Sequence, residues 1–499
     1  MPEKRRPYRI GSGLLALLAG AIYPLSLAPT DWPLAGLLSV AALCALVQGR
    51  GWREVFWRGL WYGAGLFGVG ASWVYVSIHV YGEAPPLLAG LFTGLFVALL
   101  ALCLALPLAL LGLVRRATPL LMLFVFPSVW VLAEWLRGWF LTGFPWLYLG
   151  YGHLDTWLAG WAPLGGVLAV SWLAAFTAAA MAQLRFANKH NPPLLGGLAL
   201  VALCWLAGAG LAGKSWTEPA PTPLRVALVQ PALPLNVKWD QSSLEHILDL
   251  YSDTTEPLWE NDLVIWPESA IPELLHHVSP YLQVMDDRAR DAGAALITGI
   301  PTWSDGRYYN SVLALGEGEG LYHKRRLVPF GEYVPLEQWL RGTIRFFDLP
   351  MSAFSRGPAS QPLLQAGDLA IGTAICYEIV YQDLVADSAA SADILLTVSN
   401  DTWFGTSAGP HQHFQMARLR ALENGKPVLR GTNDGITAII DSQGRVEASL
   451  PQFEPAVLVG EVVPHSGTTP FGRVGSWPVV LLSGVLLGLG AATARQKVL

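Results

Sequence analysis

Three side chains that could together carry out acyl transfer lie at or just beyond the ends of expected strands. Glu268 follows the apolar run DLVIWP, Cys376 ends AIGTAIC, and Lys324 lies in LYHKRRLVPFGEYVP. Strand ends are where α/β folds usually build their sites. Taken singly, Glu268 could be a solvated loop residue or a helix cap, and Lys324 could belong to a surface charge cluster with Arg325 and Arg326.

The thiol, the carboxylate and the ammonium complement one another chemically. A thiol with a pKa of about 8.5 needs a base or a positive neighbour to react as a thiolate. A buried carboxylate can accept the thiol proton and return it to a leaving group. An ammonium can offset the negative charge of a tetrahedral intermediate. Glu268, Lys324 and Cys376 therefore form a complete acyl-transfer set that needs no histidine.

Cys376 is one of four cysteines in the chain. The other three, Cys44, Cys103 and Cys204, fall in apolar segments, where a small thiol is ordinary helix filler. Cys376 therefore has no disulfide partner in its own segment. In an oxidising compartment such a thiol is either buried filler or a nucleophile, and the cysteine count alone leaves both readings open.

His411 and His413, in GPHQHFQ, raise the alternative of a metal site. Their spacing would place them on different faces of a helix but on the same face of a strand. Because no Asp, Glu or Cys completes a ligand set at a familiar spacing, we expect no metal and no other cofactor. We expect these histidines to cap or brace the loop after SNDTWFG (399–405).

The segments that must position these residues are of two kinds. The chain is 53% hydrophobic and 14% charged, which is typical of a membrane protein, and its net charge of −5 argues against nucleic acid as a partner. We expect a seven-span membrane domain (1–216), a globular domain (217–473) and an eighth span with a tail (474–499). Each span needs roughly 20 apolar residues. The eight expected spans are 10–28, 33–49, 57–78, 86–113, 119–138, 160–184, 194–213 and 476–494.

The distribution of basic residues predicts the orientation of these spans. If the N-terminus is cytoplasmic, the cytoplasmic loops include Arg50, Arg115 and Arg116, whereas the opposite loops 29–32 and 79–85 contain no Lys or Arg. Both termini are then cytoplasmic, and the globular domain lies outside, in the periplasm of a bacterial-type inner membrane. A cleaved signal peptide is the alternative for the first span, but no small-residue cleavage site precedes the six spans that follow.

The globular domain has the sequence pattern of a layered α/β or α+β fold. Apolar runs bounded by turn residues predict strands, and amphipathic helical segments lie between several of them. A late pair of strands around 442–444 predicts a hairpin. The expected strands are 224–230, 262–267, 294–301, 309–316, 369–376 and 393–399.

Three stretches of the globular domain resemble the carbon-nitrogen hydrolase (nitrilase) superfamily and its Glu-Lys-Cys triad. They are WPESA with Glu268, HKRRLVPFGEYVP with Lys324 and Glu332, and CYE with Cys376. The resemblance implies an α-β-β-α sandwich. The spans, together with VQPALPLNVKWD and the stretch 399–435, make the whole chain similar to bacterial apolipoprotein N-acyltransferases.

The resemblance also implies roles for single residues. Glu268 would be the general base, Lys324 would stabilise the oxyanion, and Cys376 would carry the acyl group as a thioester. Glu332 corresponds to an additional essential glutamate that positions Lys324 or the incoming amine. Further family positions beside the site are Trp239, Tyr377 and Glu378.

The reaction that the resemblance implies has two lipid substrates. An acyl chain would pass from a phospholipid, typically phosphatidylethanolamine, to the α-amino group of the diacylglyceryl-cysteine of an apolipoprotein. This ping-pong transfer would be the last step of lipoprotein maturation, catalysed by a membrane-embedded monomer. The stretches 139–157 and 344–361 would form a lipid entry or a lid.

Two rival interpretations are a membrane-tethered amidase and a transporter with an external binding domain. An anchor would need one helix, so seven further spans argue against the amidase. A transporter would have polar residues deep in its spans, and few occur beyond Glu134, which lies near Arg137.

Overall fold

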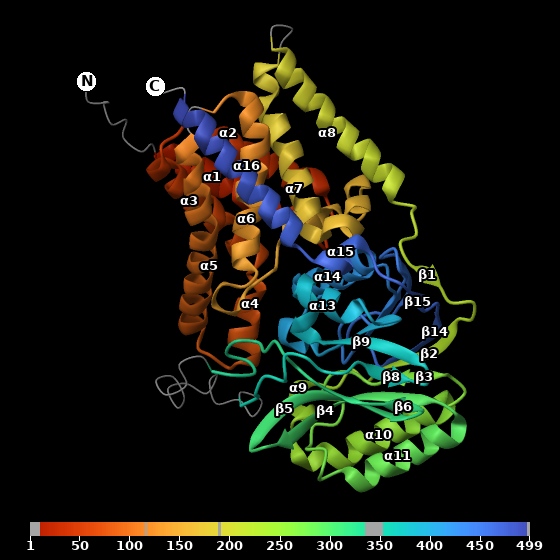
Figure 1. Cartoon of the computed structure of the whole chain (residues 1–499). Coiled ribbons are helices and arrows are strands. Elements are labelled where there is room, and N and C mark those ends of the chain that lie inside the picture. The colour runs from red at the N-terminus through yellow and green to blue at the C-terminus, as the bar shows by residue number, and fades with distance from the viewer. Residues whose placement is uncertain (1–9, 115–116, 188–190, 335–352, 497–499) are drawn as a thin grey trace. The chain divides into compact units, whose positions relative to one another are not determined.

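The computed structural model describes residues 10–114, 117–187, 191–334 and 353–496 (Figure 1). The chain forms two compact units. The membrane unit comprises Met1–Tyr75, Pro85–Lys214 and Ser476–Leu499, and the globular unit comprises Val76–Ala84 and Ser215–Gly475. The expected domain limits, 216/217 and 473/474, lie within two residues of these limits. The sequence did not predict that 76–84 belongs to the globular unit.

Nine α-helices and several short 3-10 turns build the described part of the membrane unit. The α-helices are α1 (Ile10–Ile22), α2 (Pro33–Val47), α3 (Trp52–Gly70), α4 (Trp73–Val76), α5 (Pro86–Leu108), α6 (Pro119–Arg137), α7 (Ala162–Gln183), α8 (Pro192–Leu211) and α16 (Trp477–Gln496). Most of them are apolar on all sides, as expected for helices surrounded by lipid and by one another.

The structure supports several membrane spans but does not confirm the expected number of eight. Five described helical segments are long and apolar enough to cross a membrane, and a sixth arises if the pair Trp52–Gly70 and Trp73–Tyr81, bent by 53°, is one span. The first two expected spans are the shorter apolar helices Gly11–Ser26 and Pro33–Val47. At about 1.5 Å per residue such helices are shorter than the roughly 30 Å hydrocarbon core. The five segments are Pro86–Val114, Pro119–Arg137, Trp157–Phe186, Pro192–Leu211 and Trp477–Ala494.

The aromatic stretch 139–157 has a buried middle and exposed ends. Trp146 is buried, whereas Trp139 and Trp157 are about half exposed. The buried charges of α6 hold this stretch, because Glu134 Oε1 accepts the Leu149 N–H at 2.7 Å. Its role in lipid entry stays a prediction. The first half of the other expected lid, 344–352 of 344–361, lies outside the described residues.

Two sheets form the centre of the globular unit. In spatial order the first sheet consists of β14 (Ala456–Val462), β2 (Leu224–Gln230), β3 (Leu263–Ile265), β4 (Ala295–Ser304), β5 (Arg307–Gly316) and β7 (Leu321–His323). The second consists of β13 (Val446–Ser449), β12 (Ala438–Ile440), β11 (Val428–Thr432), β10 (Ile394–Ser399), β9 (Leu369–Ile375), β8 (Leu364–Ala366) and β6 (Gly318–Glu319). A short pair, β1 (Glu218–Pro219) and β15 (His465–Ser466), lies outside both.

The two sheets pack face to face and are covered by helices. One core joins β-branched and aliphatic residues of both sheets, including Ile265 and Ile371. A second core joins the other face of the first sheet to α10 (Leu244–Thr255) and α11 (Ser279–Ala292) (Figure 1). Contacts with the second sheet come from α13 (Gln382–Ala389) at β9 and α14 (Gly409–Asn424) at β11. This is the α-β-β-α layering that the resemblance implied.

Parallel strands bring the candidate residues to the same edges of these sheets. The strands β2, β3 and β4 run parallel to one another, as do β9, β10 and β11. Glu268 comes three residues after β3, and Cys376 comes directly after β9. The expected hairpin is formed by the antiparallel strands β12 and β13.

Candidate active site

Glu268 is held in a tight turn beyond β3. The next residue, Ser269, has a φ of 45°, in the left-handed region that non-glycine residues rarely adopt. Gly299 of β4 permits this turn, because a Cβ there would lie 2.5 Å from the Pro267 carbonyl oxygen and 2.8 Å from the Glu268 Cα. The lack of a side chain at Gly299 thus lets the Glu268 backbone approach the sheet.

Lys324 lies between two carboxylates in a group that we call the Lys324 cluster (Glu268, Lys324 and Glu332). Its Nζ is 3.2 Å from Glu268 Oε1 and 2.9 Å from Glu332 Oε1. Asn310 Nδ2 donates to the same two oxygens at 2.8 and 2.9 Å. The Asn400 N–H donates to the other Glu268 oxygen at 2.8 Å. Every side chain of the cluster is buried, so its geometry is fixed on several sides.

The charges of the Lys324 cluster keep its lysine protonated. Burial alone would lower the pKa of Lys324, but the charges of Glu268 and Glu332 raise it well above its usual value. With both glutamates ionised, the cluster carries one excess negative charge. It can therefore accept a proton without losing its lysine cation.

Cys376 occupies a strained position at the start of a 3-10 turn, Cys376–Val380. Its φ is 50°, which is uncommon for a non-glycine residue and costs energy that neighbouring contacts must offset. One such contact is from His413 Nε2, which donates to the Cys376 carbonyl at 3.1 Å. The turn places the thiol beyond the end of β9.

The Cys376 thiol is protonated at rest. Burial raises its pKa, the negative charge of Glu268 raises it further, and Lys324 only partly offsets both. Because the charges of Glu268 and Lys324 both act on this thiol, the three residues predicted from the sequence lie in one site. A thiol in this setting needs a base at the moment of attack rather than a preformed thiolate.

Glu378 links the Cys376 turn to the chain beside Lys324. Its Oε2 accepts the Ile375 N–H at 2.9 Å, and its Oε1 accepts the N–H groups of Arg325 at 2.6 Å and Arg326 at 3.0 Å. Burial raises the pKa of Glu378, although these hydrogen bonds oppose the rise. Glu378 thus joins the backbone of the Cys376 turn to that of Arg325 and Arg326, and it also accepts the Tyr322 hydroxyl at 3.0 Å.

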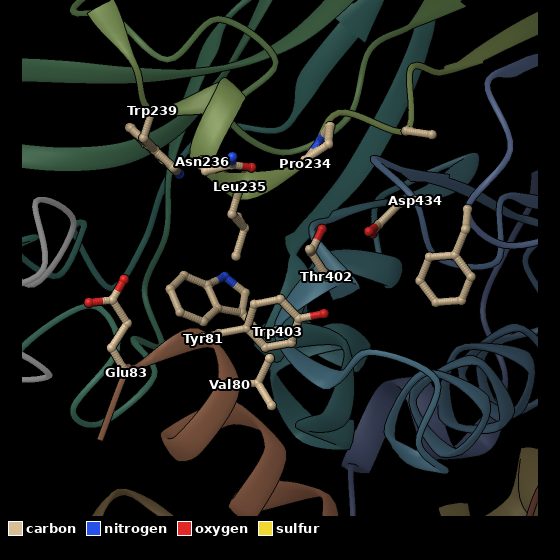
Figure 2. Close-up of a pocket in the computed structure, with 12 residues that line it drawn as sticks. Val80, Tyr81, Glu83, Pro234, Leu235, Asn236, Trp239, Thr402, Trp403 and Asp434 are labelled. Carbon is tan, nitrogen blue, oxygen red and sulfur yellow. The ribbon is translucent and has the colours of Figure 1, made fainter. Parts of the chain in front are cut away.

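The other two predicted residues lie next to this centre. The Tyr377 ring packs edge to face against Tyr381, with centroids 5.3 Å apart. Trp239 lines a cavity of about 590 Å³ in the globular unit, together with Trp403 and Asp434 (Figure 2). The Lys324 cluster and Cys376 do not line this cavity, so it adjoins the candidate centre rather than containing it.

A second buried charge group was not predicted from the sequence. In this Asp401 cluster (Asp401, His413 and Arg430), the Asp401 carboxylate contacts His413 Nδ1 at 3.0 Å and Arg430 at 2.5 Å. Ser399 also donates to Asp401 Oδ1. His413 therefore braces the Cys376 turn, which the sequence did not predict, and through Asp401 it also contacts the segment 399–405 near which the sequence placed its bracing role. Within the described ranges no three His, Cys, Asp or Glu side chains are grouped to hold a metal ion.

Three further contacts of the site escaped the sequence reasoning. Asn310 and Asn400 hold the carboxylate of Glu268, and Lys238 Nζ donates to its backbone carbonyl at 2.8 Å. Lys238 is fully buried, and burial lowers its pKa to about 8. The position of Lys238 beside Trp239 was the only sequence signal for it, since a polar residue alone does not reveal its partner.

Comparison with known proteins covers both units. Residues 19–180 match the family model described as apolipoprotein N-acyltransferase N-terminal domain, and residues 225–469 match that described as carbon-nitrogen hydrolase. An apolipoprotein N-acyltransferase of Pseudomonas aeruginosa (strain LESB58) is 49% identical over 491 residues, which is 97% of this chain and 96% of the relative. The corresponding protein of Azotobacter vinelandii is 50% identical, over 97% of this chain and 95% of the relative.

A more distant relative extends the match. The apolipoprotein N-acyltransferase of Photobacterium profundum is 40% identical over 508 aligned residues, covering 99% of this chain and 97% of the relative. Each alignment runs through the membrane unit and the globular unit, so the likeness is not confined to one of them. The chain belongs to the apolipoprotein N-acyltransferase family.

Proposed function

We propose that this chain transfers an acyl chain from a phospholipid to the α-amino group of the N-terminal diacylglyceryl-cysteine of apolipoproteins. Family membership supports the reaction class. The observation that carries the mechanism is the buried Lys324 ammonium, 3.2 Å from Glu268, with both charges acting on the Cys376 thiol. We infer that Glu268, Lys324 and Cys376 are the catalytic residues.

In the first half of the reaction, Glu268 takes the thiol proton as the Cys376 sulfur attacks an ester carbonyl of the phospholipid. The carbonyl oxygen becomes an oxyanion, which Lys324 stabilises. When the tetrahedral intermediate collapses, the carbon–oxygen ester bond breaks and Glu268 returns the proton to the leaving lysophospholipid oxygen. The acyl chain stays on Cys376 as a thioester.

In the second half, the neutral α-amine of the apolipoprotein attacks the thioester carbonyl. Lys324 again faces the oxyanion, and Glu268 accepts a proton from the attacking nitrogen. The carbon–sulfur bond breaks, an amide forms, and the thiolate regains a proton from Glu268. The two substrates thus use one site in turn, which gives ping-pong kinetics.

The charge count of the site supports this assignment. Before attack, two carboxylates and one ammonium carry a total charge of −1, and the thiol is neutral. Moving the thiol proton to Glu268 creates a thiolate but leaves the total at −1. Glu332 holds Lys324 in place at 2.9 Å while Glu268 takes up and returns the proton.

Both substrates are anchored in a bilayer, which is why a multi-span enzyme suits the reaction. We propose eight spans in a bacterial inner membrane, cytoplasmic termini, a periplasmic globular unit and a monomeric enzyme. Phosphatidylethanolamine is the proposed donor. Thiol-reactive labelling of a single cysteine introduced at exposed Asp368, in cells with an intact inner membrane, tests the placement of the globular unit. Labelling only after permeabilisation of the inner membrane would contradict it.

Intact-mass analysis of the purified enzyme tests the covalent mechanism. Incubation with phospholipid alone should add the mass of one acyl chain, and a diacylglyceryl lipopeptide with a free amine should remove it. The adduct should be absent from Cys376→Ser. Turnover without any adduct would exclude the thioester, and hydrolysis of small amides without acyl transfer would favour a membrane-tethered amidase.

A further inference from the structure

The cavity beside the candidate centre combines aromatic faces with acidic groups. Tyr81, Trp239 and Trp403 line it, and the carboxylates of Asp434 and Glu83 face it from two segments far apart in the sequence (Figure 2). Its volume of about 590 Å³ is within the range of small-molecule sites. All of these residues belong to the globular unit.

Asp434 has an unsatisfied oxygen in this cavity. Its side chain is 6% exposed, and its Oδ1 is buried without a hydrogen-bond partner among the described residues. Burial raises the pKa of Asp434 to about 6, so the carboxylate is mostly ionised at neutral pH. A buried carboxylate oxygen without a donor is unfavourable, which indicates that a donor arrives with a ligand.

Neighbouring charged groups do not provide that donor. Asp401 is negative and is held by the Arg430 guanidinium, while Lys238 acts on Asp434 only through its charge and donates to the Glu268 carbonyl. The Thr402 hydroxyl donates to Asn400 Oδ1 at 2.6 Å, so its proton does not serve Asp434 Oδ1 either. Glu83, which is exposed, adds a second carboxyl group to the lining of the cavity.

The aromatic side chains are suited to a cation. Two contacts hold Trp403 in place. Its backbone carbonyl accepts a hydrogen bond from the Ser77 hydroxyl at 2.8 Å, and its ring packs edge to face against Tyr81 with the ring centroids 6.1 Å apart. Aromatic faces attract ammonium groups, and a carboxylate supplies a charge-assisted hydrogen bond. The Trp239 indole N–H is also buried without a partner in the described structure, so it can donate to an acceptor on the same ligand.

We propose that this cavity binds a primary ammonium group of a substrate, with Asp434 as its hydrogen-bonded counter-ion and Tyr81 and Trp403 as its aromatic wall. The proposal rests on the proposed function, because two substrates of that reaction carry such a group. One is the head group of an aminophospholipid donor, and the other is the α-amine of the acceptor. Both also carry oxygen acceptors for the Trp239 N–H.

Two chain segments that form the wall of the cavity also hold Glu268, the candidate base. Lys238, next to Trp239, donates to the Glu268 carbonyl at 2.8 Å. The Asn400 N–H, two residues before Thr402, donates to Glu268 Oε2 at 2.8 Å. A ligand held by Asp434 therefore lies beside the two segments whose residues Lys238 and Asn400 hold Glu268.

The test uses the full-length enzyme in detergent micelles and follows each half-reaction separately. Thioester formation is timed by mass with phosphatidylethanolamine and with phosphatidylglycerol of the same acyl chains, for wild type and Asp434→Asn. Transfer to a lipopeptide amine is then timed from enzyme loaded with phosphatidylglycerol. We expect the rate of one ammonium-dependent half-reaction to fall roughly tenfold in the variant, which corresponds to the loss of one charge-assisted hydrogen bond.

The outcomes separate the two sources of the ammonium. A loss confined to loading from phosphatidylethanolamine assigns the cavity to the head group, and a loss confined to the transfer step assigns it to the acceptor amine. Equal losses with both donors and no effect on transfer, or no loss at all, would overturn the proposal. If wild type forms no thioester with either donor, the proposed function itself fails.

Two further variants guard against misfolding. Asp434→Glu keeps the negative charge and should recover part of the rate that Asp434→Asn loses. A merely structural defect would not be rescued by this variant. Asp368→Asn, at an exposed turn between β8 and β9, removes the same charge elsewhere and should change neither half-reaction. Trp403→Leu, which removes an aromatic face, should slow the same half-reaction as Asp434→Asn. Slowing of the other half-reaction instead would contradict the assignment of the cavity as the ammonium site.

Discussion

Two buried charge groups flank the Cys376 turn, and they are arranged in opposite ways. In the Lys324 cluster one cation lies between two carboxylates, Glu268 and Glu332. In the Asp401 cluster one carboxylate lies between Arg430 and His413. The first has a spare negative charge that can take up a proton. The second does not.

The pKa of Asp401 makes this difference clear. Burial alone would raise it, but Arg430 and His413 hold the pKa of Asp401 well below its usual range. Asp401 therefore stays ionised and serves as an anchor for His413, which holds the Cys376 carbonyl. Similar residue types at similar burial thus suit different tasks, because the number of cations per carboxylate differs.

The largest expected effect is at the thiol itself. Cys376→Ser should lower acyl transfer by roughly 10⁴-fold or more, because the nucleophile acts as a unit with its base. Turnover of a phospholipid and lipopeptide mixture measures this loss. Cys204→Ala, at a half-buried cysteine of α8, is the matched control and should keep full activity. Substantial turnover by Cys376→Ser would show that Cys376 is not the nucleophile. The Lys324 cluster would then have no thiol proton to accept, and the contrast with the Asp401 cluster would lose its functional meaning.

Lys324→Met should come next, with a loss of about 10²–10³-fold, the size seen when one oxyanion donor is removed. The readout is the rate of thioester formation in folded protein, checked by thermal unfolding. Lys214→Met, at an exposed lysine, controls for the lost charge. A variant that formed the thioester at the wild-type rate would show that Lys324 only neutralises carboxylates.

Gly299→Ala would disturb the Lys324 cluster without changing any charge. The new Cβ would lie 2.5 Å from the Pro267 carbonyl oxygen, so the backbone carrying Glu268 must shift. A displacement near 1 Å is expected to cost about 10²-fold in rate. Thioester formation measures it, and Gly210→Ala, where a Cβ meets open space, is the control. An unchanged rate would mean that the position of Glu268 is not critical.

The smallest effect on the chemistry is expected from Asp401→Asn, which should instead cost about 3–5 kcal/mol of stability by leaving Arg430 without its carboxylate. Because the folded pKa of Asp401 is depressed, its contribution is present above its unfolded pKa of about 3.9 and is lost as the pH falls further. The difference in unfolding temperature between wild type and variant should therefore shrink from pH 6 to pH 3. A constant difference would contradict the ion-pair assignment.

The sequence predicted the local elements of the globular unit well. The expected strand 224–230 coincides with β2, and 393–399 differs from β10 by one residue, because short apolar runs between turn residues carry a direct strand signal. It also selected Glu268, Lys324 and Cys376 as a chemical set, which the fold brings into one site. These residues follow strands whose ends meet.

The membrane unit was predicted less completely. Hydropathy located its apolar segments, but eight full spans are not confirmed, because composition does not fix where a helix breaks. The segment 76–84 follows an apolar helix in sequence yet belongs to the globular unit, where Ser77 bonds to Trp403. Such a long-range contact leaves no periodic pattern.

The sequence by itself determined the composition of two unlike units, the order of strands and helices, and the types of side chain available for chemistry. Local patterning is sufficient for these, since hydrophobic periodicity and turn residues act over a few positions. Only the tertiary structure decided that Asn310, Asn400 and Lys238 hold Glu268, and that Lys324 is shared by two carboxylates. Burial gives those charges their strength, and burial depends on residues far apart in the chain.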